Sequence, residues 1–254
     1  MLNLERPIPP QTDPDWDAIA AIPIAECGEP MMAFGLAQNF LVYPAYYKQG
    51  IRNALPECHG RTGVFERLLT AASLLPEGVR LVVLDAWRPF AVQQYLYESL
   101  LDAVTARYPQ LDDRRRQQLT RQFVSPPDNS RNAPSPHLTG GAVDITLCDR
   151  HGRWLDMGTG FDEASPRSST TAFEQLEQPT PEQEQVRRHR RWLYNAMIEA
   201  GFSNLSSEWW HYDFGDQLWA WHSGAQAALY GPTQVHSLES LWHRQLAEQT
   251  IDPT

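Results

Sequence analysis

The stretch at residues 135–147, SPHLTGGAVDITL, constrains the fold of this 254-residue chain more than any other. After two adjacent glycines the residues alternate, so that Val143 and Ile145 face one side of a predicted strand. Asp144 leaves that apolar face and follows His137 by seven positions. We therefore expect a strand that presents a carboxylate near an imidazole, with the glycine pair between them.

The rest of the chain mixes strand and helix patterns. A β-branched and leucine-rich run at residues 79–85 predicts a strand that ends in the segment DAWRPF. The connection at residues 148–180 is longer than most loops of compact domains, so we expect it to be functional or partly mobile. Helical spacing or capping residues predict five helices, over residues 64–75, 91–104, 112–123, 181–200 and 236–248.

Charge and composition argue against several classes of protein. A net charge of -10 and a pI of about 5.2 leave no basic surface for a phosphate backbone, so we expect no nucleic-acid partner. No run of 18 apolar residues occurs, and we therefore expect no membrane span. The N-terminus carries acids and prolines where a signal peptide needs a basic start, which predicts a cytoplasmic protein. Three single cysteines, Cys27, Cys58 and Cys148, do not support a disulfide framework.

Four side chains from two segments have the chemistry of a catalytic zinc site. Such a site needs three imidazole or carboxylate ligands and one open position for water. His137 and Asp144 would supply two ligands, and the segment EWWH offers Glu208 and His211 as a free carboxylate and a third ligand. Residues three apart in a regular strand face opposite sides, so Glu208 and His211 can converge only at a bulge, twist or turn.

Structural roles compete with the catalytic ones for each of these residues. A single histidine is more often a hydrogen-bonded residue than a ligand, and Glu208 could cap a helix or strand. Asp144 could be a strand-edge carboxylate. Arg88, just after the strand at 79–85, could form an ion pair with Asp85 or stabilise an oxyanion at a metal site.

Taken together, the motifs resemble one known family. The pattern S-x-H-x-x-G-x-A-x-D, at residues 135–144, together with E-W-W-H, at 208–211, resembles the zinc-dependent D-alanyl-D-alanine dipeptidases of the vancomycin-resistance type. The segment LDAWRP is similar to the arginine segment of that family, and LDMGTGFDEASPRS is similar to its substrate-site loop. The similarity extends in order from about Asn39 to about Trp221, which makes it more specific than any one motif.

The resemblance implies a role for each of seven residues. It implies one zinc ion per chain and a small dipeptide as the substrate. The implied zinc ligands are His137, Asp144 and His211, the implied general base is Glu208, and Arg88 would steady the tetrahedral intermediate. Ser135 and Asp162 match positions near the ends of the dipeptide, with Asp162 facing the ammonium group; an exposed turn serine and a turn-capping acid are the alternatives for these two.

The patterns and the resemblance together lead us to expect an α+β fold. It would be a single domain with a central antiparallel sheet that carries the zinc site and is flanked by helices. We expect an N-terminal arm at residues 1–30, a catalytic domain at 31–230, and a C-terminal helical extension of the same domain at 231–254, packed on the outside. The sequence leaves the oligomeric state open, with a homodimer among the alternatives.

Other functions use some of the same residues. A D-alanyl-D-alanine carboxypeptidase or related peptidoglycan peptidase shares the histidine, aspartate and histidine pattern, and the expected lack of an export signal argues against it. A non-catalytic zinc-dependent peptide-binding module would need neither Glu208 nor Arg88. A serine hydrolase is disfavoured because no G-x-S-x-G segment occurs. The sequence does not distinguish glycopeptide resistance from dipeptide recycling, nor does it define the preferred side chains or chirality.

Overall fold

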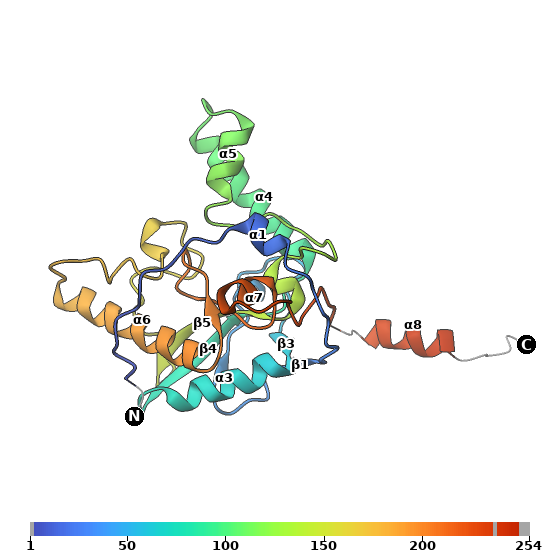
Figure 1. Ribbon diagram of the computed structural model, residues 1–254, viewed down its shortest axis with the longest axis horizontal. Coiled ribbons are helices and arrows are strands. Elements are labelled where there is room, and N and C mark those ends of the chain that lie inside the picture. Colours follow the sequence, from blue (N-terminus) through green and yellow to red (C-terminus); the bar gives the residue numbers. More distant parts are fainter. Residues whose placement is uncertain (1–2, 236–237, 249–254) are drawn as a thin grey trace, which may run out of the picture.

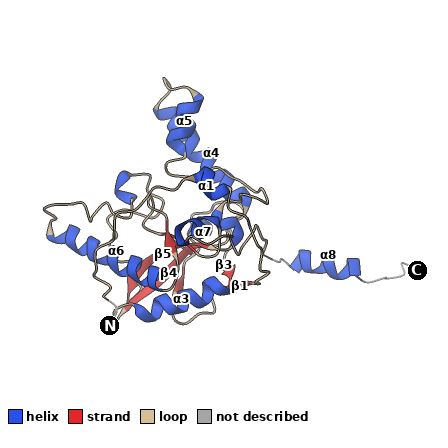
Figure 2. Ribbon diagram, in the orientation of Figure 1, coloured by secondary structure: helices blue, strands red, loops and turns tan. Residues whose placement is uncertain are grey.

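Strand β5 (Ala142–Asp149) lies in the middle of a five-stranded sheet in the computed structural model, which describes residues 3–235 and 238–248 (Figures 1 and 2). It pairs antiparallel with β4 (Val79–Asp85) on one side and with β7 (His211–Asp213) on the other. The strand predicted at residues 79–85 is confirmed, and so is the strand predicted after the glycine pair.

The two edges of this sheet differ in direction. At one edge β6 (Ser203–Asn204) continues the antiparallel pattern beside β7. At the other edge β2 (Leu41–Val42) pairs parallel with β4. The sheet is therefore mixed, and the expectation of a purely antiparallel sheet is wrong at this edge. A strand of two residues carries too little periodicity to reveal its direction in the sequence.

Both faces of β5 are covered. Val143, Ile145 and Leu147 belong to the main apolar core, as the alternation predicts. On the opposite face Cys148 packs with Val82 and Leu84 of β4 and with residues of a short helix. Asp144 lies on this second face, only 1% exposed. Asp144 therefore leaves the main core, as predicted, but is not in solvent.

Helices surround the sheet, and the fold is a mixed α+β domain. In Figure 1, α3 and α6 lie side by side along one flank, while α4 and α5 project together from the opposite side. The helices are α1 (Trp16–Ala20), α2 (Ala45–Lys48), α3 (Thr62–Leu74), α4 (Phe90–Arg107), α5 (Asp113–Thr120), α6 (Pro181–Glu199), α7 (Gln217–Ser223) and α8 (Leu238–Glu248). The remaining elements are the strands β1 (Met31–Ala33) and β3 (His59–Arg61), which pair antiparallel, and the 3-10 turns η1 (Pro136–Thr139) and η2 (Pro166–Ser168).

The helix α6 begins and ends where its punctuation predicts. Thr180 caps it, with the Thr180 side chain accepting from the Gln183 backbone and the Gln183 side chain accepting in return. Pro181 occupies the first turn, and Gly201 follows the helix at a φ of 95°, a conformation that glycine adopts without strain. The capping residues and the glycine therefore determine where α6 begins and ends.

The two ends of the chain behave differently. The N-terminal arm runs over the body and pairs with it at Ile24 and Ala228. At the C-terminal end α8 forms, but in Figure 1 it projects away from the body, so the expected packing on the outside is not seen. Residues 236–237, also part of the predicted helix, lie outside the described residues. No helix in the described part of the chain combines the length and apolarity that crossing a membrane requires, and all three cysteines are free thiols.

Candidate active site

Strand register places three of the site's side chains in one row. Asp85 on β4 lies opposite Asp144 on β5, and Asp144 lies opposite His211 on β7. Directly opposed residues of antiparallel strands bring their Cβ atoms within about 4.5–5.5 Å. A register shift between Val83 and Asp85 allows this row to form, because it places Asp85 rather than Leu84 opposite Asp144.

His137 joins the row from the turn that precedes β5. Pro136 opens the 3-10 turn η1, and Gly140 ends it with a φ of 73°. A Cβ on the next residue, Gly141, would lie 2.5 Å from the Phe214 carbonyl oxygen. Both glycines are therefore needed for the chain to reverse closely enough to bring His137 beside Asp144, which answers why the motif contains the pair.

The donor atoms of the three predicted ligands face one shared point. His137 Nε2 lies 3.2 Å from His211 Nδ1 and 3.4 Å from Asp144 Oδ2, and His211 Nδ1 lies 3.2 Å from Asp144 Oδ1. Ligand atoms about 2.0–2.1 Å from a tetrahedral zinc ion lie about 3.3–3.4 Å from each other. The spacing of the two histidine nitrogens matches that of two corners of a zinc tetrahedron, and each nitrogen lies at a similar distance from one of the two Asp144 oxygens. The three side chains form a potential metal cluster within the described residues.

The outer nitrogens of the two histidines fix which ring atoms carry lone pairs. His137 Nδ1 lies 2.7 Å from the Ala86 carbonyl oxygen, which can only accept, so this nitrogen carries the hydrogen. His211 Nε2 lies 2.9 Å from Asp213 Oδ1, which has the same effect. In their neutral forms both rings therefore direct lone pairs at each other, and this repulsive arrangement becomes favourable when a cation lies between them.

Glu208 reaches the cluster from a turn. Residues 209–210 form a turn, and β7 begins only at His211, so the irregularity expected between Glu208 and His211 is present. Glu208 Oε2 lies 3.9 Å from His211 Nδ1, and burial raises the pKa of Glu208 to about 8. Trp209 and Trp210 are both buried and stack edge to face, which holds the turn.

Arg88 connects the carboxylates of the row. Its Nε donates to Asp85 Oδ2 at 2.8 Å and its Nη2 donates to Asp144 Oδ2 at 3.0 Å. The predicted ion pair with Asp85 is confirmed, but Arg88 also lies beside the metal cluster. Burial opposes ionisation of Asp144, yet the charges and hydrogen bonds of His137 and His211 hold the pKa of Asp144 well below its usual range.

Ser135 lies at one side of the pocket. It is 8% exposed; its Oγ accepts from the Asp128 backbone N–H at 3.1 Å and donates to the Pro126 carbonyl oxygen at 3.4 Å. The alternative of an exposed turn serine is therefore wrong. These bonds also hold the loop before η1 against the pocket.

Asp162 lies on another side of the pocket, in the long connection after β5. Its φ of 60° is unusual for a residue other than glycine, and aspartate is one of those that tolerate it. Loss of hydration of the carboxylate raises the pKa of Asp162 to about 7. The positive charge of Arg88 opposes this shift and the negative charge of Asp144 reinforces it. Since the residue as a whole is exposed at the rim, solvent screening weakens this shift.

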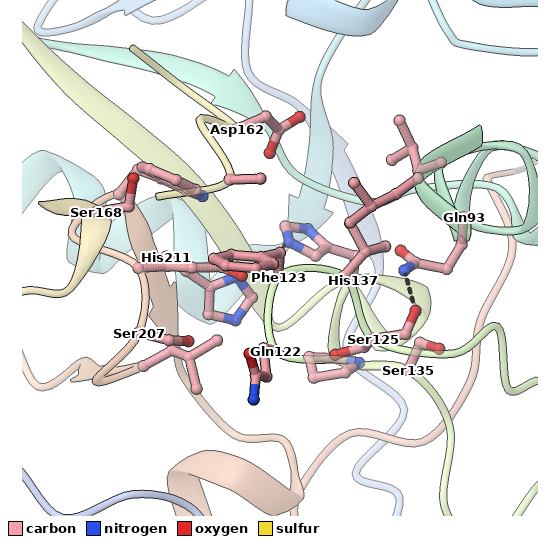
Figure 3. A pocket seen from close by; sticks show the side chains of 18 of the residues that line it. Gln93, Gln122, Phe123, Ser125, Ser135, His137, Asp162, Ser168, Ser207 and His211 are labelled. Carbon is pink, nitrogen blue, oxygen red and sulfur yellow. Dashed lines mark hydrogen bonds and ion pairs between the residues drawn. The ribbon is translucent and has the colours of Figure 1, made fainter. Parts of the chain in front are cut away.

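One cavity of about 300 Å³ brings these side chains together (Figure 3). The two histidine rings lie next to each other in this view, with Asp162 and Ser135 on opposite sides of them. Six of the seven predicted site residues line it: Arg88, Ser135, His137, Asp162, Glu208 and His211. Asp144 lies beneath them, buried, and contacts both rings.

Two important polar residues were not predicted from the sequence. Gln93 accepts from Arg88 Nη1 at 2.6 Å and donates to the Ser125 carbonyl oxygen at 2.8 Å (Figure 3). Asp213 supports His211 from behind, and burial together with the charge of Asp213 raises the pKa of Asp216 well above its usual value. A signal for Asp213 existed, because residues two apart in a strand share a face. Gln93 had none, since its partners come from distant segments.

A buried arginine holds the long connection in place. Arg190 of α6 donates to the carbonyl oxygens of Met157, Ser169 and Arg167 at 2.7–2.8 Å. These three carbonyls flank Asp162 on both sides along the chain. The connection, which the sequence suggested was functional or partly mobile, is thus bound to α6 before and after Asp162.

Comparisons with known proteins agree on one family. A family model described as D-ala-D-ala dipeptidase, Peptidase_M15, matches residues 33–227. A D-alanyl-D-alanine dipeptidase from Synechocystis sp. is 37% identical over 223 residues, which is 79% of this chain and 88% of the relative. Another, from Escherichia coli, is 34% identical over 136 residues, covering 54% of this chain and 55% of the relative.

The similarity to solved structures is lower. A vancomycin-resistance D,D-pentapeptidase, VanY, solved in complex with Zn(II), is 18% identical over 68% of this chain and 83% of that chain, with a TM-score of 0.40.

Proposed function

Because this chain belongs to the D-Ala-D-Ala dipeptidase family of metallopeptidases, we propose that it hydrolyses the free D-alanyl-D-alanine dipeptide in a zinc-dependent reaction. One observation carries the proposal. Two imidazole nitrogens at the spacing of two zinc ligands, each with an Asp144 oxygen nearby, lie beside the Glu208 carboxylate and two unengaged N–H donors of Arg88. A purely structural metal site would need neither neighbour.

The proposed ligands are His137, Asp144 and His211, holding one zinc ion per chain. A bound zinc ion lowers the pKa of its water toward about 7 and polarises a carbonyl group. Asp213 and the Ala86 carbonyl keep the two rings oriented for this role through their outer nitrogens. The ligands lie on neighbouring strands and one glycine-closed turn, so their positions need no rearrangement.

Glu208 is the proposed general base. Its carboxylate is free of ion pairs with arginine or lysine in the described chain and faces the ligand cluster. Burial favours its protonated form, while a cation in the cluster would favour the carboxylate. Glu208 would take a proton from the attacking water and return it to the leaving amine, two steps that suit a carboxylate poised between its two forms.

Arg88 is the proposed oxyanion partner. Three of the five N–H donors of its guanidinium are engaged by Asp85, Gln93 and Asp144. The other two stay available, and burial makes hydrogen bonds from them strong. Because three partners fix the guanidinium plane, Arg88 would meet developing charge without reorganising.

The two ends of the dipeptide would be bound on opposite sides of the His137 and His211 rings. We propose that Asp162 pairs with the free ammonium group and that Ser135 lies near the other end. A peptide with a blocked N-terminus would leave Asp162 unpaired and would bind less well. The proposed catalytic domain spans residues 31–230, and Trp16 from the arm before it also lines the cavity.

The test measures release of free D-alanine from D-Ala-D-Ala by the zinc-loaded protein. L-Ala-L-Ala and N-acetyl-D-Ala-D-Ala run beside it, with Glu208→Ala as the control variant. We expect turnover of the free D,D-dipeptide alone and a loss of roughly 10²–10⁴-fold in kcat in the variant, with zinc still bound.

Two other outcomes would replace the proposal. Cleavage of the acetylated compound at a comparable rate would favour a carboxypeptidase or another peptidoglycan peptidase. Bound zinc with no cleavage of any of the three compounds would favour a non-catalytic peptide-binding module.

A further inference from the structure

The cavity is longer than the substrate proposed for it. It follows α4 from Gln93, beside Arg88, through Leu96 and Leu100 to Ala103. At a rise of about 1.5 Å per residue, Gln93 and Ala103 are about 15 Å apart along the helix. An extended dipeptide spans about 7 Å. A dipeptide of two alanines anchored at the metal cluster would therefore leave the distal part of the cavity to water.

The distal part has a different chemistry from the part around the metal cluster. Leu96 and Leu100 form one turn-to-turn stripe on α4, and Phe123 and Val124 line the cavity from the segment after α5. Arg88, Asp162 and Glu208, by contrast, are close enough to the cluster to shift one another's ionisation. The cavity therefore has a charged part and an apolar part.

We propose that the apolar part is a side-chain subsite, so that the enzyme takes D,D-dipeptides in which one residue carries a large apolar side chain. This inference rests on the proposed function and extends its substrate class beyond D-Ala-D-Ala. An apolar side chain would displace water from Leu96, Leu100 and Phe123, which is favourable in proportion to the area covered.

A longer peptide fits this part of the cavity less well. Each added peptide bond would bring an N–H and a C=O that need partners, and an unpaired polar group out of water is costly. Ser99 of α4 and Gln122 of the segment after α5 are the polar side chains that line this part of the cavity. A leucine or phenylalanine side chain needs no hydrogen-bond partner, whereas each added peptide group would need two.

The first experiment compares kcat/KM for D-Ala-D-Ala with two series of dipeptides. One series, D-Ala-D-Leu and D-Ala-D-Phe, enlarges the C-terminal residue; the other, D-Leu-D-Ala and D-Phe-D-Ala, enlarges the N-terminal residue. We expect one series to be cleaved at least as efficiently as D-Ala-D-Ala, by up to roughly tenfold. If D-Ala-D-Ala is cleaved and both series are more than tenfold poorer, the subsite does not exist although the proposed function stands.

A matched pair of variants tests the location. Ala103 lines the cavity and Ala106 does not, yet both are exposed residues of the same helix. Ala103→Trp should fill the distal part and lower the ratio of kcat/KM for the favoured large dipeptide to that for D-Ala-D-Ala by about tenfold or more. Ala106→Trp should leave that ratio unchanged. Equal ratios in both variants would place the side chain elsewhere and overturn the assignment.

Binding separates this inference from catalysis. Calorimetry with zinc-loaded Glu208→Ala measures the affinity for the same dipeptides without turnover. We expect a large dipeptide of the favoured series to bind at least as tightly as D-Ala-D-Ala, even if no cleavage is seen with the unaltered protein. Tighter binding of D-Ala-D-Ala than of every large dipeptide, or no binding of any, would overturn the inference.

Discussion

The half of the site built on the sheet is held by backbone hydrogen bonds, whereas the half built on α4 and the long loops is held by hydrogen bonds from single side chains. The row from Asp85 through Asp144 to His211 follows from strand register, which backbone hydrogen bonds define. On the other half, the positions of Asp162 and of the segment around Ser125 depend on Arg190 and Gln93, single buried side chains that bind backbone carbonyls.

This difference predicts how the two halves respond to substitution. Changes on the sheet half should act on zinc binding, because the ligands and their supports lie there. Changes on the loop half should act on substrate affinity and leave zinc bound. The comparison would break if a loop substitution released the metal, or if a ligand substitution altered only KM.

The largest effect is expected from His211→Ala. Removing one of three proposed ligands should release zinc at micromolar free metal and lower kcat/KM by more than roughly 10³-fold, because water activation and carbonyl polarisation are both lost. Zinc content after dialysis and steady-state kinetics measure this. His151→Ala, at an exposed turn histidine, is the matched control. Full zinc content in His211→Ala would remove His211 from the ligand set.

A smaller effect on zinc affinity is expected from Asp213, which forms a hydrogen bond with the proposed ligand His211. Asp213→Asn keeps the shape of the side chain but weakens the hydrogen bond that orients the His211 ring. Loss of such a support costs about 10–100-fold in metal affinity. Competition with a chelator would measure it, with Asp149→Asn at the far end of β5 as the control. Unchanged zinc affinity in Asp213→Asn would show that strand register alone orients the ring.

On the loop half, Asp162→Asn should raise KM by about tenfold, because a charge-assisted hydrogen bond to the ammonium is lost. Burial raises the pKa of Asp162 toward 7, and exposure to solvent weakens this shift, so the carboxylate is neutral at low pH and charged at high pH. KM of the unaltered enzyme should therefore fall as pH rises through the pKa of Asp162, at or below about 7, and the variant should lack that step. Loss of zinc from Asp162→Asn would contradict the separation of the two halves.

The smallest effect on activity is expected at Arg190. Arg190→Lys cannot serve all three carbonyls that the guanidinium binds, and each buried carbonyl left unpaired costs about 1–3 kcal/mol. We expect a lower free energy of unfolding in urea, a KM raised severalfold and an unchanged zinc content. An unaltered KM would mean that the connection keeps its shape without Arg190.

Local sequence signals predicted the sheet half better than the loop half. The alternation around Asp144, the glycine pair before it and the need for an irregularity between Glu208 and His211 all depend on neighbours in the chain, and the structure shows each of them. The parallel pairing of β2 and the role of Gln93 depend on segments far apart, and neither was predicted.

The sequence by itself determined which chemistry is available here: two histidines, an aspartate, a glutamate and an arginine in an order similar to one peptidase family, on segments with clear strand and turn signals. Tertiary structure alone decided that Arg88 also binds Asp144, that Gln93 accepts from Arg88, and that the cavity continues along α4. The physical reason is range. Alternation, capping and glycine turns are set by residues a few positions apart, whereas a buried polar contact or a cavity depends on segments that meet only when the sheet has formed.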